Sequence, residues 1–239
     1  MTIAQQILFE DNHLLAVNKL CGQIVQGDKT GDTPLSDLVK AFIKERDNKP
    51  GNVFCGVIHR IDRPVSGVVL FAKTSKALSR MNEQVKEREM KKTYWALCKE
   101  APRQEQGHLE DWLLRNEKSN KSFVVKEGTD QAKLAKLDYR LIGVTDGGYH
   151  LIEIDLLTGR HHQIRAQLAN MGCPIKGDLK YGAPRSNPDG GISLHARCIS
   201  FIHPVRQEPI TISAPTPPDP IWQEYSDAIN PTTTTHETI

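Results

Sequence analysis

Apolar and polar residues follow two different periods along this chain, and together they predict helices mixed with strands. A stripe of apolar residues three and four apart, from Leu35 to Ile43, predicts a helix that Thr33 caps and that has Pro34 in its first position. The same spacing predicts three further helices, at 75–89, at 158–172 and around Trp222.

Shorter runs, either apolar throughout or alternating with polar residues, predict strands. They lie at Ile7–Phe9, Leu14–Asn18, Val53–Ile58, Val68–Phe71, Thr93–Leu97, Ser122–Val125, Lys136–Ile142, Tyr149–Leu156, Ile199–Ile202 and Ile210–Ser213. Strands and helices are mixed without regular alternation. We therefore predict the α+β class, with a mixed and largely antiparallel central sheet flanked by helices.

The composition is that of a single sizeable domain and narrows the possible partners. Of the 239 residues, 38% are hydrophobic and 25% are charged, as is usual for a soluble globular protein. We expect one domain over 1–226 and a disordered tail over 227–239, which contains four consecutive threonines. The formal net charge is only +2, so any binding of nucleic acid must rest on a local basic patch.

The cysteines and the N-terminus bear on the compartment. The 5 cysteines are widely spaced and form no C-x-x-C pair, which favours free thiols in a reducing cytoplasm over a disulfide framework or a zinc ribbon. The first residues lack the basic start and apolar run of a signal peptide. No stretch approaches the roughly 18 apolar residues of a membrane span. We therefore expect a cytoplasmic protein with no membrane partner.

The first candidate for chemistry is a charged loop, 59–67, between two predicted core strands. His59, Arg60 and Arg63 surround the single acid Asp62. Burial favours the neutral form of a carboxylate, but neighbouring guanidinium groups favour the ionised form, which can act as a nucleophile or a base. The residues alone are equally compatible with a structural cluster of ion pairs at the end of a strand.

The segment 158–165, Thr-Gly-Arg-His-His-Gln-Ile-Arg, opens the third predicted helix, and a helix N-terminus is a natural anion-binding position. Arg160 and Arg165 are five residues apart, so one can meet a phosphate while the other points inward to a carboxylate. His161 and His162 are adjacent and diverge on a helix, and no third ligand stands nearby at zinc spacing. We therefore expect solvated or hydrogen-bonded histidines and no metal.

Other segments are weaker signals on their own. Tyr94 and Trp95 must point to opposite faces of a strand, so one can stack on a base while the other packs in the core. A glycine-rich loop with Lys180 and Tyr181 can contact phosphate or simply turn the chain. The charged segment 86–92 is interpreted as a solvated helix end rather than a binding stripe.

Taken in order, these segments resemble the RluA-type pseudouridine synthases. His59-Arg60-Ile61-Asp62-Arg63 with Ser66-Gly67 is similar to that family's signature loop, Lys92-Thr93-Tyr94 to its tyrosine motif, and 158–165 to its arginine motif. The stretches 177–182 and 194–196 and the ending 208–215 match later parts of the family pattern. The resemblance spans about residues 5–225, and its ordered motifs argue against a chance match. Ile61 and Val65 depart from the usual leucine and threonine. We expect no S4-type RNA-binding domain before the catalytic region.

The resemblance implies an isomerase with a catalytic cleft that converts uridine in RNA to pseudouridine. It implies that Asp62 acts on the ribose, as a nucleophile at C1′ or a base at C2′, that Tyr94 stacks on the target uracil, and that Arg165 pairs with Asp62. Arg60 would fill the space left by the flipped base. The RNA-binding residues implied or predicted are His59, Arg60, Arg63, Arg160, His162, Lys180 and Tyr181.

The expected partner is ribosomal or transfer RNA, and the expected enzyme is a monomer without a metal or an organic cofactor. Two alternatives remain. A non-catalytic RNA-binding or ribosome-assembly protein on the same fold would bind RNA equally well without Asp62. A hydrolase that used Asp62 as a nucleophile on nucleosides would release free uracil. The residues do not indicate which uridine is modified.

Overall fold

The computed structural model describes residues 1–27 and 31–226, so the tail predicted to be disordered lies outside the described residues. The helices are α1 (Ile3–Gln6), α2 (Leu35–Arg46), α3 (Ser75–Lys86), α4 (Gln163–Asn170) and α5 (Pro220–Ser226), with a 3-10 turn at Leu179–Tyr181. The strands are β1 (Ile7–Glu10), β2 (Leu14–Lys19), β3 (Gly56–Val57), β4 (Ser66–Ala72), β5 (Lys91–Cys98), β6 (Gln106–Asn116), β7 (Lys121–Val125), β8 (Lys133–Val144), β9 (His150–Leu156), β10 (Leu194–Ile202) and β11 (Pro209–Ser213).

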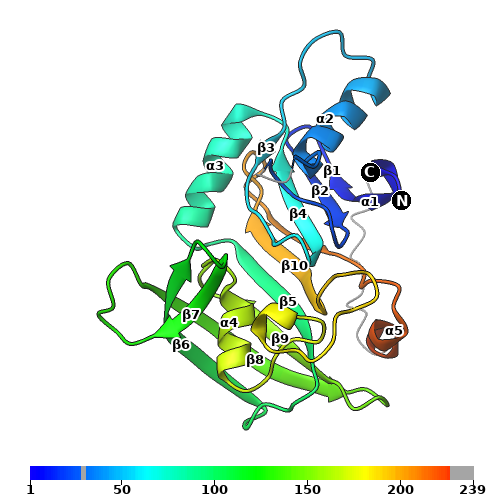
Figure 1. Cartoon of the computed structure of the whole chain (residues 1–239). Helices are drawn as coiled ribbons and strands as arrows, with labels where there is room; N and C mark the ends of the chain where they lie inside the picture. Colours follow the sequence, from blue (N-terminus) through cyan, green and yellow to red (C-terminus); the bar gives the residue numbers. More distant parts are fainter. Residues whose placement is uncertain (28–30, 227–239) are drawn as a thin grey trace.

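One sheet of 11 strands runs through the whole molecule (Figure 1). Its strand order is β1-β2-β4-β10-β5-β9-β8-β6-β7, with β3 beside β4 and β11 beside β10. Strands β4 and β10 are parallel, and the other pairs among the described strands are antiparallel. The predicted α+β class with a mixed, largely antiparallel sheet is confirmed.

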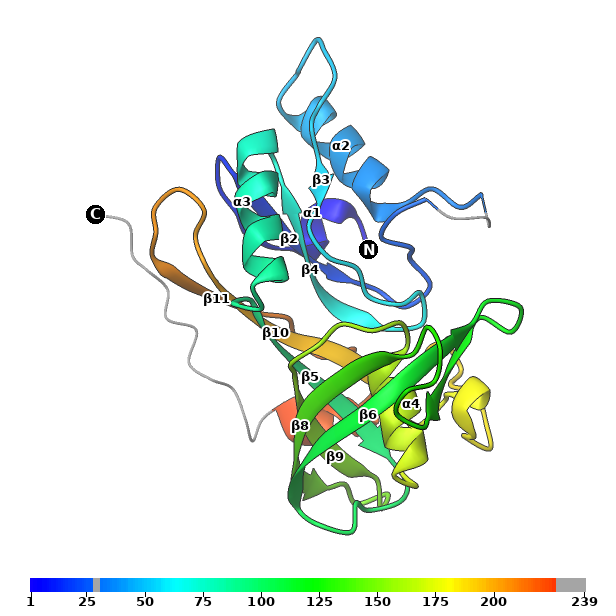
Figure 2. The ribbon, with the colours of Figure 1, turned by 90° about the vertical axis from the view of Figure 1, so that its left-hand side faces the viewer.

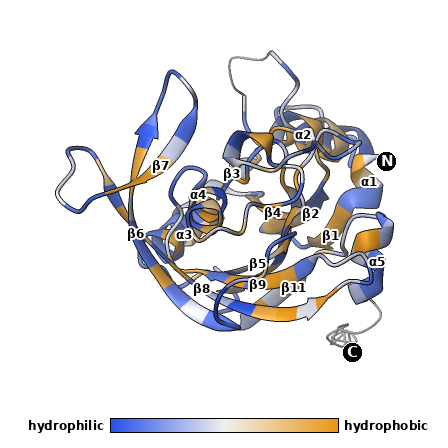
Figure 3. Cartoon of the chain, turned by 60° about the horizontal axis from the view of Figure 1, so that its bottom comes forward, coloured by the Kyte–Doolittle hydropathy of each residue, from blue (hydrophilic) through white to orange (hydrophobic). Residues whose placement is uncertain are grey.

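The sheet is curved, and helices cover it on both sides. Helices α3 and α4 lie within its concave side (Figure 3), and α4 lies against β6, β7 and β8 (Figure 2). Trp95 packs with Trp222 of α5 in a separate cluster, whereas Tyr94 belongs to the main core. The two adjacent aromatics therefore face opposite sides of the sheet, as predicted.

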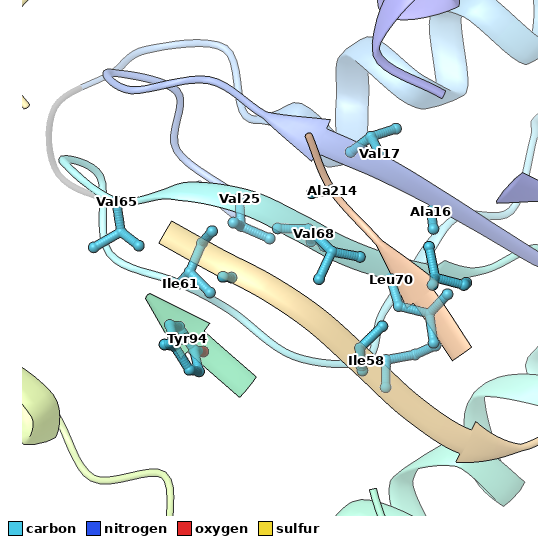
Figure 4. Close-up of a cluster of buried hydrophobic side chains, with 14 of the residues drawn as sticks. Ala16, Val17, Val25, Ile58, Ile61, Val65, Val68, Leu70, Tyr94 and Ala214 are labelled. Atoms are coloured by element: carbon cyan, nitrogen blue, oxygen red, sulfur yellow. The ribbon is translucent and has the colours of Figure 1, made fainter. Parts of the chain in front are cut away.

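The main core forms where β2 and β4 pack under α2 and α3. All seven residues of β4 are buried, which explains why its sequence is apolar from Gly67 to Ala72 rather than alternating. Side chains such as Val17, Val68 and Leu70 fill this layer (Figure 4). Tyr94 and Ile61 continue the same core toward the charged loop, so that loop rests on packed side chains.

The structure differs from the predicted elements where local signals were weak. Only Gly56–Val57 of the predicted strand Val53–Ile58 pairs with a neighbour. Helix α2 begins one residue later than expected, with Pro34 and not Thr33 at the cap. The long strand Gln106–Asn116 was not predicted, because it is mostly half-buried or exposed and rich in charge. The short helix Ile3–Gln6 was also not predicted.

The parallel pair β4–β10 brings together two of the segments that carried the resemblance. Ser66 lies opposite His195, and its hydroxyl donates to Nδ1 of that ring at 2.8 Å, while Nε2 donates to the carbonyl of Ala214 at 3.2 Å. Gly67 has a φ of 115°, and a Cβ there would overlap the backbone of Ala196. These residues hold the fold together at the centre of the sheet.

Stability should fall as the pH is lowered below about 6.5, and His195 should contribute to the fall. Burial lowers the pKa of His195 to about 4, so between these values the unfolded chain binds a proton that the folded protein does not. The free energy of unfolding therefore decreases toward low pH, by on the order of 3 kcal/mol from this group over the full window. Urea unfolding of the wild type and of His195→Gln, each at about pH 7 and pH 5, measures this decrease in the free energy of unfolding. An identical pH dependence in both proteins would contradict the assignment.

Candidate active site

A cleft of about 1480 Å³ gathers nine of the ten residues predicted to act in catalysis or RNA binding. Loop 58–65, the start of β5, the segment 156–165 and the turn between β6 and β7 all border it. The nine are His59, Arg60, Asp62, Arg63, Tyr94, Arg160, His162, Arg165 and Lys180. Tyr181 does not line the cleft and is buried behind it.

The cleft is far more basic than the protein as a whole. Its described lining carries 11 Lys and Arg against 3 Asp, whereas the whole chain has 31 basic and 29 acidic residues. This is the local patch that the modest net charge required of any nucleic-acid binder. Part of it comes from Lys86, Arg88, Lys91 and Lys92, so the segment interpreted as a solvated helix end borders the cleft.

The charged loop takes its shape from three buried apolar residues spaced along it. Ile58, Ile61 and Val65 are buried in the core (Figure 4), while Arg60 is exposed and the side chain of Asp62 is 31% exposed. Burial of the apolar residues on either side thus fixes the loop and leaves the carboxylate at the cleft surface.

His59 and Arg63 have partners within the protein. The backbone N–H of Leu70 donates to Nε2 of His59 at 3.1 Å, and burial lowers the pKa of this histidine to about 3, so it is neutral. Arg63 forms an exposed ion pair with Asp32 at 2.9 Å. The structure therefore gives His59 a contact that ties the loop to β4, whereas Arg60 and Arg63 present their charges at the cleft surface.

Lys19 holds the charged loop through its backbone carbonyls, a role that the sequence did not predict. This side chain is fully buried at the end of β2, and its ammonium donates to the carbonyls of Leu20, Arg63 and Val65 at 3.0, 3.1 and 2.6 Å. Burial lowers its pKa to about 8. The only sequence signal was a lysine closing an apolar strand. Two of its acceptors come from a loop more than forty residues later in the chain.

Arg165 links two carboxylates at the bottom of the cleft. Nη1 donates to Oδ2 of Asp62 at 3.1 Å, while Nε and Nη2 form a bidentate pair with Asp178 at 2.6 and 2.8 Å. Burial opposes the charge of Arg165, but the hydrogen bonds to Asp178 and Asp62 raise its pKa. Asp178 is 1% exposed and was not predicted as a site residue, although the segment 177–182 had been singled out.

The segment before α4 is a structured turn and not a helix start. Helix α4 begins at Gln163, so the anion-binding position expected at Thr158 and Gly159 is not formed there. The hydroxyl of Thr158 donates to Oε1 of Gln163 at 2.7 Å, and this oxygen also accepts from the backbone of Arg160 at 3.0 Å. The guanidinium of Arg160 donates to the carbonyl of Leu134 at 2.9 Å and lies half-buried in the cleft wall.

His162 ends this turn and lies against the catalytic candidate. Its φ of 52° is left-handed, its Nε2 lies 3.6 Å from Oδ2 of Asp62, and its Nδ1 lies 3.0 Å from the hydroxyl of Tyr181. Burial lowers the pKa of His162 to about 2, and the charge of Arg165 acts in the same direction. The ring is therefore neutral.

Tyr181 and Lys180 fasten the turn between β6 and β7 to the site. The Tyr181 hydroxyl accepts from the backbone of Ser122 at 2.8 Å, and burial raises its pKa to about 12. Lys180 is exposed and donates to the carbonyls of Ser119 and Asn120 at 3.4 and 3.1 Å. The burial of Tyr181 suits a supporting role, whereas Lys180 lies at the cleft surface.

Tyr94 forms part of the floor of the cleft. It is 7% exposed, pairs across the sheet with Ala196 and Ile154, and lies near Ile61 (Figure 4). Burial raises its pKa well above the usual value for tyrosine, and the negative charge of Asp62 adds to the shift. The ring is therefore a neutral, largely apolar surface beside the carboxylate.

Within residues 1–27 and 31–226, no group of three or more His, Cys, Asp and Glu side chains is placed to hold a metal ion. In the same ranges no helix combines the length and the apolar character needed to cross a membrane. All five cysteines are free thiols.

A family profile described as RNA pseudouridylate synthase matches residues 13–170, more than half of the chain and all of the loop that carries Asp62. The chain belongs to this family. The RluA-type resemblance seen in the sequence is confirmed, and so is the enzyme class, since pseudouridine synthases are isomerases.

Curated relatives of this pseudouridine synthase family cover nearly the whole chain. A ribosomal large subunit pseudouridine synthase D of Xylella fastidiosa is 32% identical over 91% of this chain and 67% of its own length. A ribosomal large subunit pseudouridine synthase C of Buchnera aphidicola is 32% identical over 95% of this chain and 71% of its own length. An uncharacterized RNA pseudouridine synthase of a Synechocystis strain is 32% identical over 90% of this chain and 66% of its own length. The chain spans about two thirds of the length of these relatives.

Solved structures of pseudouridylate synthases share the fold. Human RNA Pseudouridylate Synthase Domain Containing 4 superposes with a TM-score of 0.75 at 23% identity, over 90% of each chain. Human RNA Pseudouridylate Synthase Domain Containing 1 gives 0.69 at 23% identity, over 89% of this chain and 83% of its own. The sheet described above is therefore the pseudouridine synthase fold.

Proposed function

We propose that this protein isomerises uridine in structured RNA to pseudouridine, with Asp62 as the catalytic carboxylate. The observation that carries the proposal is the position of Asp62 at the surface of a strongly basic cleft, with one oxygen held by the buried guanidinium of Arg165. A carboxylate aimed in this way is a suitable nucleophile or base for chemistry on a ribose.

The reaction breaks the bond between N1 of uracil and C1′ and joins C5 to C1′; the proton on C5 leaves, and N1 takes up a proton. A base stacked in RNA cannot turn over, so it must be flipped into the cleft, which requires a few kcal/mol of unstacking free energy. Arg60 is exposed next to Asp62 and is our candidate for the space that the base leaves. The basic lining supplies contacts to the phosphates.

Each of the three catalytic candidates takes a different part. Asp62 acts on the ribose, at C1′ or at C2′. Tyr94 stacks its ring on the uracil, and it lies close enough to Asp62 for the negative charge of that carboxylate to raise its pKa. Arg165 holds Asp62 from below, while its pairing with Asp178 fixes the guanidinium. In this proposal His59 and Tyr181 position the cleft walls, while Arg63, Arg160 and Lys180 contact the RNA.

The names of the relatives point to the RNA of the large ribosomal subunit as the first substrate to test, with transfer RNA as the second. We propose that the protein works as a cytoplasmic monomer, for which its five free thiols and the site built from one chain give support.

The test is the release of tritium from C5-labelled uridine in ribosomal and in transfer RNA. Release from one pool would establish the isomerisation and name the substrate class. Binding of RNA with no release from either pool would instead favour the non-catalytic RNA-binding protein. Appearance of free uracil would favour the hydrolase.

Two substitutions of Tyr94 should distinguish the contribution of the ring to activity from that of the hydroxyl. Tyr94→Phe keeps the surface on which uracil stacks, and we expect it to retain activity within about tenfold. Tyr94→Leu removes a contact of about 1–3 kcal/mol per base, which corresponds to a loss of roughly 5- to 150-fold in rate. Single-turnover tritium release measures both. Equal rates for Tyr94→Leu and the wild type would make Tyr94 a core residue only.

A further inference from the structure

The contacts of His162 place a second hydrogen-bond donor beside Asp62. Nε2 lies 3.6 Å from Oδ2, the same oxygen that Nη1 of Arg165 contacts at 3.1 Å. At the opposite side of the ring, Nδ1 lies 3.0 Å from the hydroxyl of Tyr181. The side chain of His162 is only 6% exposed, so its two nitrogens face these partners rather than open solvent.

A neutral imidazole has one donor nitrogen and one acceptor nitrogen, so the tautomer decides what Asp62 meets. The ring is neutral, because burial and the charge of Arg165 oppose a second proton. It also stacks on His161, with ring centroids 3.8 Å apart and an interplanar angle of 19°. Two stacked imidazolium ions would repel each other, so the stacking agrees with neutral rings.

The hydroxyl of Tyr181 selects the tautomer. It accepts the backbone N–H of Ser122 at 2.8 Å and has one proton to give, either to Nδ1 of His162 at 3.0 Å or to the carbonyl of Ser122 at 3.2 Å. If the carbonyl took it, Nδ1 of His162 would have to carry the ring proton. Nε2 would then turn a lone pair toward a carboxylate oxygen. If Nδ1 accepts it, Nε2 carries a proton and directs it at Asp62. The arrangement with the proton on Nε2 uses the shorter hydrogen bond of the Tyr181 hydroxyl, at 3.0 Å, and avoids placing the lone pair of Nε2 against that of the carboxylate oxygen.

We propose that His162 is a positioning residue that donates its Nε2 proton to Oδ2 of Asp62, in a tautomer fixed by Tyr181. This rests on the proposed function, because it assigns a task within the same site. Arg165 and His162 then both hold Oδ2, and none of the described residues hydrogen-bonds to Oδ1. Oδ1 is therefore the oxygen that acts on the ribose. The pair closes from 3.6 Å to about 3 Å when RNA fills the cleft, as catalytic hydrogen bonds commonly do.

Two substitutions distinguish this role from simple packing. Asparagine tolerates the left-handed backbone at this position, and its amide reaches the place of Nδ1 but has no atom at the place of Nε2. Glutamine is longer, and its amide nitrogen reaches the place of Nε2. His162→Asn therefore removes the donor to Asp62, and His162→Gln restores it. His150→Asn, at the start of β9 and outside the cleft lining, is the matched control.

We expect His162→Asn to lower kcat about 10- to 100-fold with KM for RNA nearly unchanged, since a hydrogen bond to a charged group is lost. His162→Gln should recover most of the rate, and His150→Asn should behave as the wild type. An equal loss in the Asn and Gln variants, a change confined to KM, or no loss in His162→Asn would overturn the proposal.

A measurement without RNA separates this inference from the proposed function. Nitrogen-15 NMR of the histidine rings distinguishes the Nε2–H, Nδ1–H and doubly protonated forms, and the signals lost in His162→Asn identify residue 162. We expect Nε2–H at neutral pH. A wild type that releases tritium but shows the Nδ1–H form would overturn the role of His162 alone. A wild type with Nε2–H that releases none would overturn the proposed isomerisation instead.

Discussion

Asp62→Asn is expected to reduce pseudouridine formation by about four orders of magnitude or more, because the amide can neither attack the ribose nor accept its proton. RNA binding should stay within about tenfold of the wild type, since the change removes one of only 3 acids among the described residues that line a cleft with 11 basic ones. The fold should also remain, because Arg165 keeps its bidentate contact to Asp178.

Single-turnover tritium release and filter binding of the same RNA measure the two effects separately. Asp37→Asn is a suitable control, since Asp37 pairs with Lys40 on the surface of α2, outside the lining of this cleft. Substantial turnover by Asp62→Asn would refute the assignment of the catalytic carboxylate. A loss of binding equal to the loss of rate would show that Asp62 serves recognition.

Arg165→Met should remove both activity and stability. The change leaves Asp178, which is 1% exposed, as an uncompensated buried charge, and breaking a buried pair in this way costs about 3–5 kcal/mol. It also removes the donor to Asp62, so the protein that remains folded should be severely impaired. Urea unfolding and tritium release measure the two losses.

The double variant Arg165→Met with Asp178→Leu separates these effects. Replacing both members of a buried pair with apolar residues is often neutral for stability, so the double variant should unfold at nearly the wild-type urea concentration. Its activity should stay low, because Asp62 still lacks its guanidinium. Recovery of activity together with stability would mean that Arg165 only holds the fold.

The motifs predicted which residues the fold brings into one cleft better than they predicted the local structure of those segments. Asp62, Tyr94 and Arg165 were predicted from ordered motifs that resemble one family, and the fold brings all three to one cleft. The partners that support them were missed. Lys19 contacts a loop 46 residues later in the chain, and Asp178 contacts Arg165 across 13 residues, so neither partner lies within the local spacing of a helix or a strand.

The errors in secondary structure have a similar origin. The segment 158–162 has helix-forming neighbours, yet hydrogen bonds from Thr158 and Arg160 to the side chain of Gln163 fold it as a turn. Strand β6 carries charges on its exposed face and is stabilised by pairing with β7 and β8. The pattern of apolar and polar residues within the strand does not indicate this pairing.

The parallel pair β4–β10 also bears on the order in which the molecule folds. About 120 residues separate the end of β4 from the start of β10, so this contact closes a long loop and needs the chain through β10. Contacts of such long sequence separation form slowly and late. On the ribosome, the strand that follows Asp62 therefore lacks its central neighbour until β10 has been synthesised, and a nascent chain that stops before Leu194 has no finished site with which to engage RNA.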